Sequence, residues 1–422
     1  MNATTAPDAP PAVADAQAVP DDWEAPLRGV RVADFTHMLA GPSAAMALAD
    51  LGASVVKFES APAGDPARNI GVGGAVFNVA NRNKRSVALD LKDRRAQEIA
   101  LRYIRSCDVV LESLRPGVME GWGLGYDAVS RLVPDIVYGS VVGFGSHGPD
   151  RERGGLDLLI QAESGMMNLS GAADGPPTKA GFQLIDTAAG LALGQAVTAA
   201  LYKKARTGRG SKIEVRLLDT ALYLQAAQIA EFSVSGALPQ RSGNANPLAS
   251  PADLFETSDG HLMIAAFKDD QWVRLCNALG LERAGSDPRY RQHADRLERR
   301  AEITALLADR LRQATTAEWY RILRDADLLV ARVRDYRDIV TDPQVEANGA
   351  LLELTSDRDQ PMLGVRLPYV LDDRTGPASA TPPHLGADTL DVMSELGIDH
   401  QELLFLLHDG VIAAPDRAVT TP

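Results

Sequence analysis

The amino-acid sequence predicts a mixed α/β protein in which a large domain contains an open parallel sheet and a smaller domain is of the α+β type. Short apolar segments alternate with segments of helical periodicity from about residue 30 to residue 144. Such alternation is typical of a parallel sheet with helices on both faces. The 422 residues are long for one domain, and the pattern changes near Val234, which indicates a second domain.

The first strand–helix–strand unit follows an N-terminal tail. We expect strands over 30–35 and 54–59, with a helix over 44–51 between them. Ser43 suits the N-cap of this helix, and Gly52 suits its C-terminal end. Because the two strands are joined through a helix, they should run parallel with a right-handed crossover.

The same alternation continues along the chain. Extended segments are expected over 86–91, 108–111, 136–144 and 213–215, and helices over about 94–106, 126–132, 157–167, 187–205 and 218–233. The helix that ends near residue 205 carries cations in its last turn and is followed by Gly208, which is a strong stop signal. These segments extend the parallel sheet and cover its faces.

A segment rich in Gly, Pro, Ser and Asn, residues 234–251, is predicted to be a linker. The elements expected after it are a hairpin and several helices, over about 255–267, 269–280, 296–314, 316–326 and 388–412. Residues 1–26 are rich in Ala, Pro and Asp and lack periodicity, so a disordered tail is expected there.

Composition and charge argue against several classes of protein. The formal net charge of −13 repels nucleic acid and anionic membranes, so neither is an expected partner. No run of about 18 apolar residues predicts a transmembrane helix, and the N-terminus lacks the pattern of a signal peptide. Cys107 and Cys276 stand far apart, which favours buried thiols in a reducing, cytoplasmic compartment. The scattered histidines predict no metal site.

The motifs of common nucleotide-binding and hydrolytic enzymes are weak or absent in this sequence, and one basic segment has two possible roles. Residues 143–148 match G-x-G-x-x-G, but Pro149 follows instead of a helix N-terminus, which disfavours dinucleotide binding. No G-x-S-x-G motif is present, which disfavours a serine hydrolase. Arg82, Lys84 and Arg85 form either a solvated basic loop or a phosphate-binding segment, to which Lys92 would add a point charge.

Asp186 is the most informative acidic residue. It stands between an apolar, strand-like segment, 182–185, and a helix rich in small residues that begins at Thr187. It is either the N-cap of that helix or a nucleophile, because a helix N-terminus lowers the pKa of a carboxyl group and keeps it ionised. The small neighbours leave room for a bulky substrate. Asp157 lies in an apolar stretch and is also a candidate helix cap.

A series of short motifs follows in a characteristic order from about residue 27 to the C-terminus. They occupy residues 34–37, 40–42, 49–53, 55–59, 83–86, 89–92, 115–118, 161–162, 164–165, 174–177, 207–210, 385–386 and 395–397. In this order and spacing the chain resembles the class III CoA-transferases, the CaiB/BaiF family. The resemblance implies an enzyme that uses an acyl-CoA and a carboxylic acid as substrates, with no permanently bound cofactor.

The resemblance also implies an interlocked homodimer and a particular domain arrangement. A large Rossmann-like CoA-binding domain would comprise 27–233 and 350–422, and a small α+β domain would comprise 252–349. Asp186 falls at the position of the family's catalytic aspartate, twelve residues after Asp174. It would attack the acyl-CoA thioester to give a mixed anhydride and then an aspartyl-CoA thioester. By family analogy we expect succinyl-CoA and small dicarboxylates as substrates.

The residues expected to bind CoA, from the resemblance and from the basic segment, are Met38, Leu39, Ala40, Lys84, Arg85, Leu89 and Lys92. Asp157 is expected to orient substrate. The chain departs from the family pattern at Ser60, Ser113 and Gly121, where CoA contacts are in question. The glycine-run loop of the formyl-CoA enzyme is also absent, with residues 243–247 in its place, which makes oxalate–formyl exchange less expected.

Two other functions are considered for the same fold. An α-methylacyl-CoA racemase would carry a His–Asp pair where this chain has Leu156 and Asp157, so one of the two proton-transfer groups is missing. A non-enzymatic CoA-binding or assembly protein would not need Asp186, and its retention argues against that role.

Overall fold

The computed structural model describes residues 25–372 and 381–415. Residues 1–24, most of the expected tail, lie outside this part of the chain. The described chain divides into two compact units: a larger one formed by 25–166, 180–234, 343–372 and 381–415, and a smaller one formed by 167–179 and 235–342.

The division assigns residues 167–179 to the smaller unit, whereas the sequence analysis placed them in the large domain. The reason is local pairing with the segment expected to be a linker. The amide of Gly243 donates to the carbonyl of Gly171 at 3.1 Å, and the guanidinium of Arg241 donates to the side chain of Asn168 at 2.9 Å.

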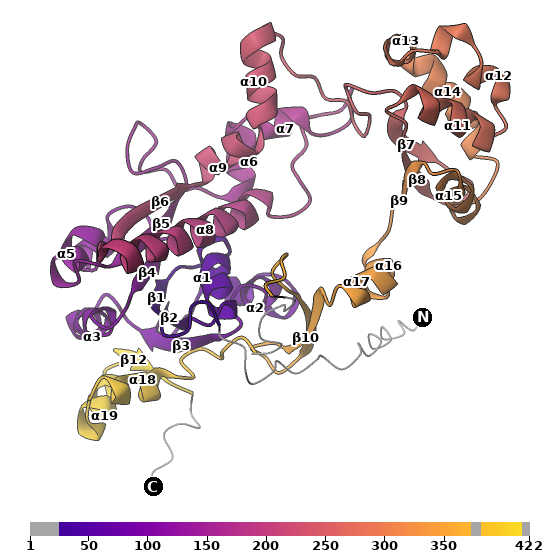
Figure 1. Ribbon diagram of the computed structural model, residues 1–422. Helices are drawn as coiled ribbons and strands as arrows, with labels where there is room; N and C mark the ends of the chain where they lie inside the picture. Colours follow the sequence, from indigo (N-terminus) through magenta and orange to yellow (C-terminus); the bar gives the residue numbers. More distant parts are fainter. Residues whose placement is uncertain (1–24, 373–380, 416–422) are drawn as a thin grey trace, which may run out of the picture. The chain divides into compact units, whose positions relative to one another are not determined.

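The larger unit is built on one mixed sheet. Among the described residues, its strands lie in the order β12-β3-β2-β1-β4-β5-β6. The strands are β1 (Arg31–Phe35), β2 (Ser54–Ser60), β3 (Lys84–Leu89), β4 (Val109–Glu112), β5 (Val137–Val142), β6 (Ser211–Arg216) and β12 (Ile412–Ala413). All neighbours pair in parallel except β12, which runs antiparallel beside β3 (Figure 1). The prediction of an open, mostly parallel α/β sheet is confirmed.

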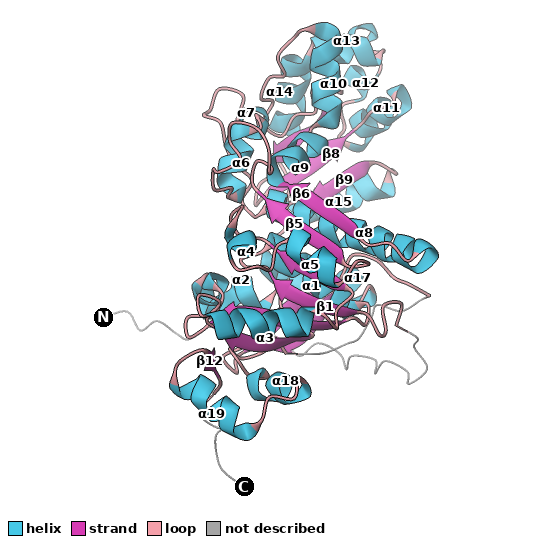
Figure 2. Ribbon diagram, turned by 90° about the vertical axis from the view of Figure 1, so that its left-hand side faces the viewer, coloured by secondary structure: helices cyan, strands magenta, loops and turns pink. Residues whose placement is uncertain are grey.

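Successive residues of the central strands enter two different hydrophobic cores. In β1, Val32 packs into the core that contains α1 and α8, whereas Ala33 packs into the core that contains α3 and α5. Because helices bury both faces, these strands carry apolar residues on both sides rather than in alternation, with buried charged residues such as Asp34 and Lys57 among them (Figure 2). The covering helices are α1 (Ala40–Asp50), α8 (Leu184–Thr207) and α9 (Leu217–Leu224) on one face, and α3 (Arg94–Ile104), α5 (Tyr126–Leu132), α18 (Thr389–Glu395) and α19 (His400–His408) on the other.

Helix α8 packs closely against α1 along its buried stripe. A Cβ atom added to Gly190 would lie 2.8 Å from the carbonyl oxygen of Ala40 and 3.0 Å from the Cβ of Ser43, so glycine is needed for this approach. Part of the small-residue pattern on α8 therefore serves helix packing. No membrane-spanning helix was predicted, yet α8 is the one described helix long and apolar enough to meet that criterion, which core helices also meet.

Two helix starts differ from the predictions. Helix α1 begins at Ala40, so Ser43 lies inside the helix and is not its N-cap; Pro42 is tolerated because first-turn amides need no partner within the helix. Helix α8 begins at Leu184 after Gln183, so Asp186 lies in its first turn and is not its N-cap. The predicted strand-like segment before Asp186 is therefore wrong for Leu184 and Ile185.

The smaller unit contains an antiparallel sheet and a cluster of helices with its own core. Its strands are β7 (Ala252–Glu256), β8 (His261–Ala265) and β9 (Leu329–Arg332), and its helices are α11 (Asp269–Ala278), α12 (Glu282–Gly285), α13 (His293–Glu298), α14 (Arg300–Leu311), α15 (Thr316–Asp325) and α16 (Tyr336–Val340). The expected hairpin is β7–β8. The helix expected over 296–314 is divided at Arg299 into α13 and α14.

One more predicted helix is divided in the structure. The helix expected over 157–167 is two short helices, because Gly165 adopts a positive φ of 82° between them. The elements not yet given are α2 (Ala75–Asn78), α4 (Val118–Gly121), α6 (Asp157–Glu163), α7 (Met166–Leu169), α10 (Ala226–Ser235), α17 (Pro343–Ala347), β10 (Leu351–Thr355) and β11 (Pro361–Val365).

The close contact between α1 and α8 predicts opposite effects for two glycines of the same helix. Gly190→Ala should destabilise the fold by about 1–3 kcal/mol, because the new methyl group meets a backbone oxygen that cannot move aside easily. Gly194→Ala has open space and should stabilise it by about 0.5–1 kcal/mol through helix propensity. Urea unfolding of both variants measures the difference, and equal free energies of unfolding would contradict this account of the packing.

Candidate active site

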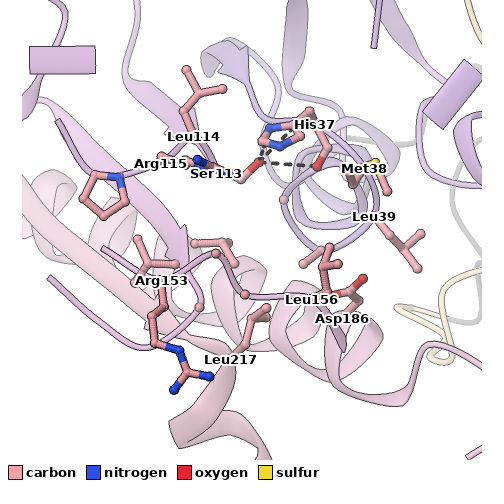
Figure 3. Close-up of a pocket in the computed structure, with 18 residues that line it drawn as sticks. His37, Met38, Leu39, Ser113, Leu114, Arg115, Arg153, Leu156, Asp186 and Leu217 are labelled. Carbon is pink, nitrogen blue, oxygen red and sulfur yellow. Dashed lines mark hydrogen bonds between the residues drawn. The ribbon is translucent and has the colours of Figure 1, made fainter. Parts of the chain in front are cut away.

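A cavity of about 470 Å³ opens at the carboxyl ends of the parallel strands. Its walls come from the loops that follow β1 and β4, from the end of β5, from the segment before α6, and from Asp186 and Leu217 (Figure 3). The strand order reverses between β1 and β4, since β2 and β3 extend the sheet on one side of β1 and β4 lies on the other. A crevice forms at such a point because the two loops diverge, and ligands of open α/β sheets bind there.

Asp186 presents its carboxylate to this cavity from the first turn of α8. The side chain is partly buried, and no described residue donates a hydrogen bond to it. Burial, and secondarily the negative charge of Asp157, raise the pKa of Asp186 to about 6. The sequence analysis expected the helix N-terminus to lower this pKa, and that expectation is wrong.

Asp157 explains why the helix N-terminus does not lower the pKa of Asp186. Its Oδ2 atom accepts hydrogen bonds from the backbone amides of Ile185 at 2.7 Å and of Asp186 at 3.1 Å. Its Oδ1 atom accepts a bond of 2.5 Å from Gln161, whose own Oε1 accepts from the amide of Ala180 at 2.8 Å. The first amides of α8 are therefore already occupied by a different carboxylate.

The position of Asp157 bears on both roles considered for it. It caps a helix, but the helix is α8 and not the one in which it lies. It is not among the residues that line the cavity, whereas its neighbour Leu156 is. Any influence of Asp157 on substrate is therefore exerted through the start of α8 and the charge felt by Asp186.

The loop after β1 places three of the expected CoA-binding residues beside Asp186. Met38, Leu39 and Ala40 all line the cavity, and Met38 has a positive φ of 67°. His37 precedes them, and its amide donates to Oγ of Ser113 at 2.9 Å. The Nδ1 atom of His37 lies 3.1 Å from the same oxygen, as the dashed lines in Figure 3 indicate. Burial lowers the pKa of His37.

The other expected CoA-binding residues lie away from this cavity. Lys84 is buried and donates from Nζ to Asp34, Asn81 and the carbonyl of Pro42, so all three of its donors are used. Arg85 pairs with Asp388 and Glu395, Leu89 is fully buried in the sheet, and Lys92 is exposed in the turn after β3. The structure therefore brings together Asp186 with Met38–Ala40 and does not bring the basic segment to them.

Two arginines in the cavity wall were not singled out by the sequence analysis. Arg153 packs over the ring of Phe144 and pairs with Glu163 at 2.6 Å. Arg115 is exposed, and no described residue pairs with or hydrogen-bonds its guanidinium. The Arg-Pro-Gly motif directly after β4 was the available signal, because it places a cation at the carboxyl end of a central strand.

The departures from the family pattern occupy different surroundings. Ser113 lines the cavity and holds His37, so it has a local partner. Ser60 ends β2, and Gly121 ends the short helix α4; neither is part of the cavity wall. Among the described residues, no group of three His, Cys, Asp or Glu side chains is arranged to hold a metal ion.

Comparisons with known proteins agree with this architecture. CoA-transferase family III matches residues 27–389. The chain is 33% identical over 391 residues to a succinate–glutarate CoA-transferase of Agrobacterium fabrum, covering 88% of this chain and 96% of the relative. It is 34% identical over 397 residues to mouse succinyl-CoA:glutarate CoA-transferase, covering 92% and 90% respectively.

Solved structures give the same assignment. A CaiB/BaiF family protein from Brucella suis superposes with a TM-score of 0.81 at 33% identity, covering 88% of this chain and 99% of that one. Rv3272 from Mycobacterium tuberculosis superposes with a TM-score of 0.77 at 34% identity, covering 86% and 98%. Sequence, fold and the cavity at the strand reversal thus agree, and the chain belongs to CoA-transferase family III as an enzyme that acts on acyl-CoA and carboxylic acid substrates.

Proposed function

We propose that this enzyme transfers coenzyme A from an acyl-CoA donor to a free carboxylic acid, with Asp186 as the covalent nucleophile. The observation that carries the proposal is a carboxylate to which no described residue donates a hydrogen bond, facing a cavity of about 470 Å³. A carboxylate held by several amides would be a poorer nucleophile, because those bonds stabilise its charge. Asp157 takes the amides of α8 and leaves the electron pairs of Asp186 available.

The proposed reaction has four steps. An oxygen of Asp186 attacks the thioester carbonyl, the C–S bond breaks, and a mixed anhydride forms with release of the CoA thiolate. The thiolate attacks the aspartyl carbonyl, and the donor acid leaves as a carboxylate. The acceptor carboxylate then attacks the aspartyl-CoA thioester and again releases the thiolate. The thiolate finally attacks the acceptor acyl carbon, giving the new acyl-CoA and restoring Asp186.

We propose that Met38, Leu39 and Ala40 border the thioester end of CoA, which is a substrate and not a resident cofactor. These residues line the cavity together with Asp186. Lys92, exposed after β3, is proposed to bind near the nucleotide end, together with Arg85, which is half-buried. Lys84 and Leu89 are buried, so any contribution they make is indirect.

A small dicarboxylic acid is the proposed acceptor. Relatives of this chain are named for succinate and glutarate. Arg115 supports the proposal, because its guanidinium lies in the cavity wall without a partner among the described residues and can bind a second carboxylate through paired hydrogen bonds. Arg115 and Asp186 line the same cavity, the one from the loop after β4 and the other from α8 (Figure 3).

We further propose an interlocked homodimer in the cytoplasm. Support comes from large apolar side chains exposed on α8, α9 and α10, which a lone chain would leave in water: Leu191, Tyr202, Leu222, Tyr223, Leu224, Ile229, Phe232 and Val234. Both cysteines are free and buried, which suits a reducing compartment. The net charge of −13 disfavours nucleic acid and anionic membranes as partners.

Removal of the nucleophile tests the mechanism. Asp186→Ala should lower CoA exchange by roughly 10³-fold or more, because no other described cavity residue can form the anhydride. Glu98→Ala, an exposed carboxylate on α3, is the matched control and should keep full activity. Exchange is followed by mass spectrometry with a panel of acyl-CoAs and free acids.

Normal turnover in Asp186→Ala would refute the mechanism.

Incubation with a 2-methylacyl-CoA in deuterated water distinguishes CoA transfer from racemisation. No α-deuterium uptake is expected, because Leu156 in the cavity wall carries no exchangeable proton. Rapid uptake would favour the racemase.

The pKa of Asp186 predicts the pH profile of exchange. Only the ionised carboxylate attacks, so kcat/KM should rise about tenfold per pH unit up to about pH 6 and level off above it. Asp157→Asn removes the neighbouring negative charge and should move this kinetic pKa downward, while Glu98→Ala should leave it in place. An unchanged kinetic pKa in Asp157→Asn would show that Asp186 is not the group being titrated.

Arg115 should set the preference for a second carboxylate. Arg115→Met should raise KM for glutarate by roughly 10–100-fold, the loss of a charge-assisted hydrogen-bonded pair, and Arg115→Lys should lie between. A monocarboxylic acid of the same chain length is the internal control, and its KM should change little. If both acids are affected equally, Arg115 serves general binding and the dicarboxylate assignment loses its structural support.

A further inference from the structure

Four ionisable residues are buried beneath the loop that faces Asp186. Asp34, Lys57, Asp65 and Lys84 are each no more than 5% exposed. They form two ion pairs: Nζ of Lys57 lies 2.9 Å from Oδ2 of Asp65, and Nζ of Lys84 lies 2.9 Å from Oδ2 of Asp34. The sequence analysis gave a role to Lys84 alone, as a candidate CoA-binding residue, and none to the other three.

The pair formed by Lys57 and Asp65 is bonded to the backbone of the loop. Lys57 donates from Nζ to the carbonyl oxygen of Thr36 at 2.7 Å. Oδ1 of Asp65 accepts from the amide of Met38 at 3.1 Å. One ion pair therefore holds the carbonyl of Thr36, directly before the segment that lines the cavity, and the amide of Met38 within that segment.

The second pair holds both ends of the same loop. Oδ1 of Asp34 accepts from the amide of Thr36 at 2.9 Å and from its hydroxyl at 2.5 Å. Lys84 donates from Nζ to the carbonyl oxygen of Pro42 at 2.9 Å. Between these anchors, Gly41 approaches the side chain of Thr36 so closely that a Cβ atom would lie 2.5 Å from it.

The loop needs such support because its backbone is strained at Met38. A φ of 67° is uncommon for a residue with a side chain and persists only where surrounding contacts impose it. The amide held by Asp65 belongs to this same residue. Met38, a residue of the cavity wall, therefore has both the unusual φ and the hydrogen bond to Asp65 that holds it.

Burying these charges gives little stability in return. The cost of removing an ion pair from water generally offsets its attraction, and apolar residues of similar volume would do as well or better. In the first pair the charged forms are favoured: although burial opposes it, the charges of Asp65, Asp34 and Glu59 raise the pKa of Lys57, and Lys57 lowers the pKa of Asp65. Their contribution is therefore better sought in the geometry of the loop.

We propose that Lys57 and Asp65 are positioning residues for CoA transfer, which hold the backbone of Thr36 and Met38 so that residues 37–41 face Asp186 in the geometry the reaction needs. They touch no substrate and act only through the loop. This inference rests on the proposed role of Asp186 as nucleophile.

The test compares two charge-neutral double variants that differ in one acceptor atom, Oδ1 of residue 65, which also accepts from the amide of Ala67 at 2.9 Å. Lys57→Met with Asp65→Asn keeps an oxygen for the amide of Met38, whereas Lys57→Met with Asp65→Leu removes it. The matched control is Arg82→Met with Asp50→Asn. Arg82 was a candidate for phosphate binding, but its side chain is 2% exposed and bonded to Asp50, which is 9% exposed, so it does not face a ligand. This pair makes no described contact with residues 36–42. Measured quantities are urea stability, kcat and KM for exchange, and amide hydrogen exchange of residues 36–41.

The leucine variant should lose about 100-fold in kcat, since a displacement of about 1 Å in an active site costs that much. The asparagine variant should lose no more than about tenfold, and the control should keep its kcat whatever its stability. Faster amide exchange at residues 36–41 is expected in the leucine variant and not in the control. A purely structural role would leave kcat per folded enzyme unchanged in all three variants, whatever their stability, which would overturn the proposal.

If the leucine variant does not fold, the asparagine variant decides. It lacks the donor to Thr36, so its kcat should still fall threefold or more below that of the control, and a kcat equal to the control would overturn the proposal. Failure of the proposed function is recognised separately. Full exchange by Asp186→Ala would refute the nucleophile, while hydrogen exchange of the loop would still report whether the pair holds it.

Discussion

The arrangement of the site depends on one interaction, the capping of α8 by the carboxylate of Asp157. A helix N-terminus offers free amides that attract the nearest anion. In this chain Asp157 takes the amides of Ile185 and Asp186, and Gln161 fixes Asp157 in turn. Asp186 therefore lies at the mouth of a helix without being neutralised by it. The carboxylate of Asp157 thus holds the start of the helix, and the carboxylate of Asp186 faces the cavity.

The sheet decides where that carboxylate points. Strands β1 and β4 are neighbours, yet the chain leaves them in opposite directions across the sheet, so their following loops separate and leave a crevice. Helix α8 reaches the crevice because Gly190 allows it to lie against Ala40 and Ser43. The nucleophile and the loop after β1 are thus brought together by helix packing over the sheet, although nearly 150 residues separate them in the chain.

Much of the fold was predictable because apolar periodicity reports burial directly. Runs such as Val55-Val56 are apolar on both faces and indicate a strand covered by helices, as the two cores show. Helix starts were less predictable. Ser43 has the side chain of a cap, but Ala40-Gly41-Pro42 already forms the first turn, because Lys57 holds the loop before it and Lys84 holds the carbonyl of Pro42. Local capping preference yielded to tertiary contacts.

The residues of the candidate site likewise include some that the sequence predicted and some that only the structure identified. The sequence by itself determined the α/β class and, through the family resemblance, singled out Asp186 and Met38–Ala40, because these residues stand beside motifs, or at a fixed spacing from motifs, that can be recognised in the sequence alone. Only the tertiary structure decided which charges face the cavity. Lys84 and Arg115 are both cations within motifs. Lys84 uses its donors in bonds to buried groups, whereas Arg115 has no partner among the described residues. Solvation and pairing depend on neighbours distant in sequence, and these set whether a charge binds ligand or holds the fold.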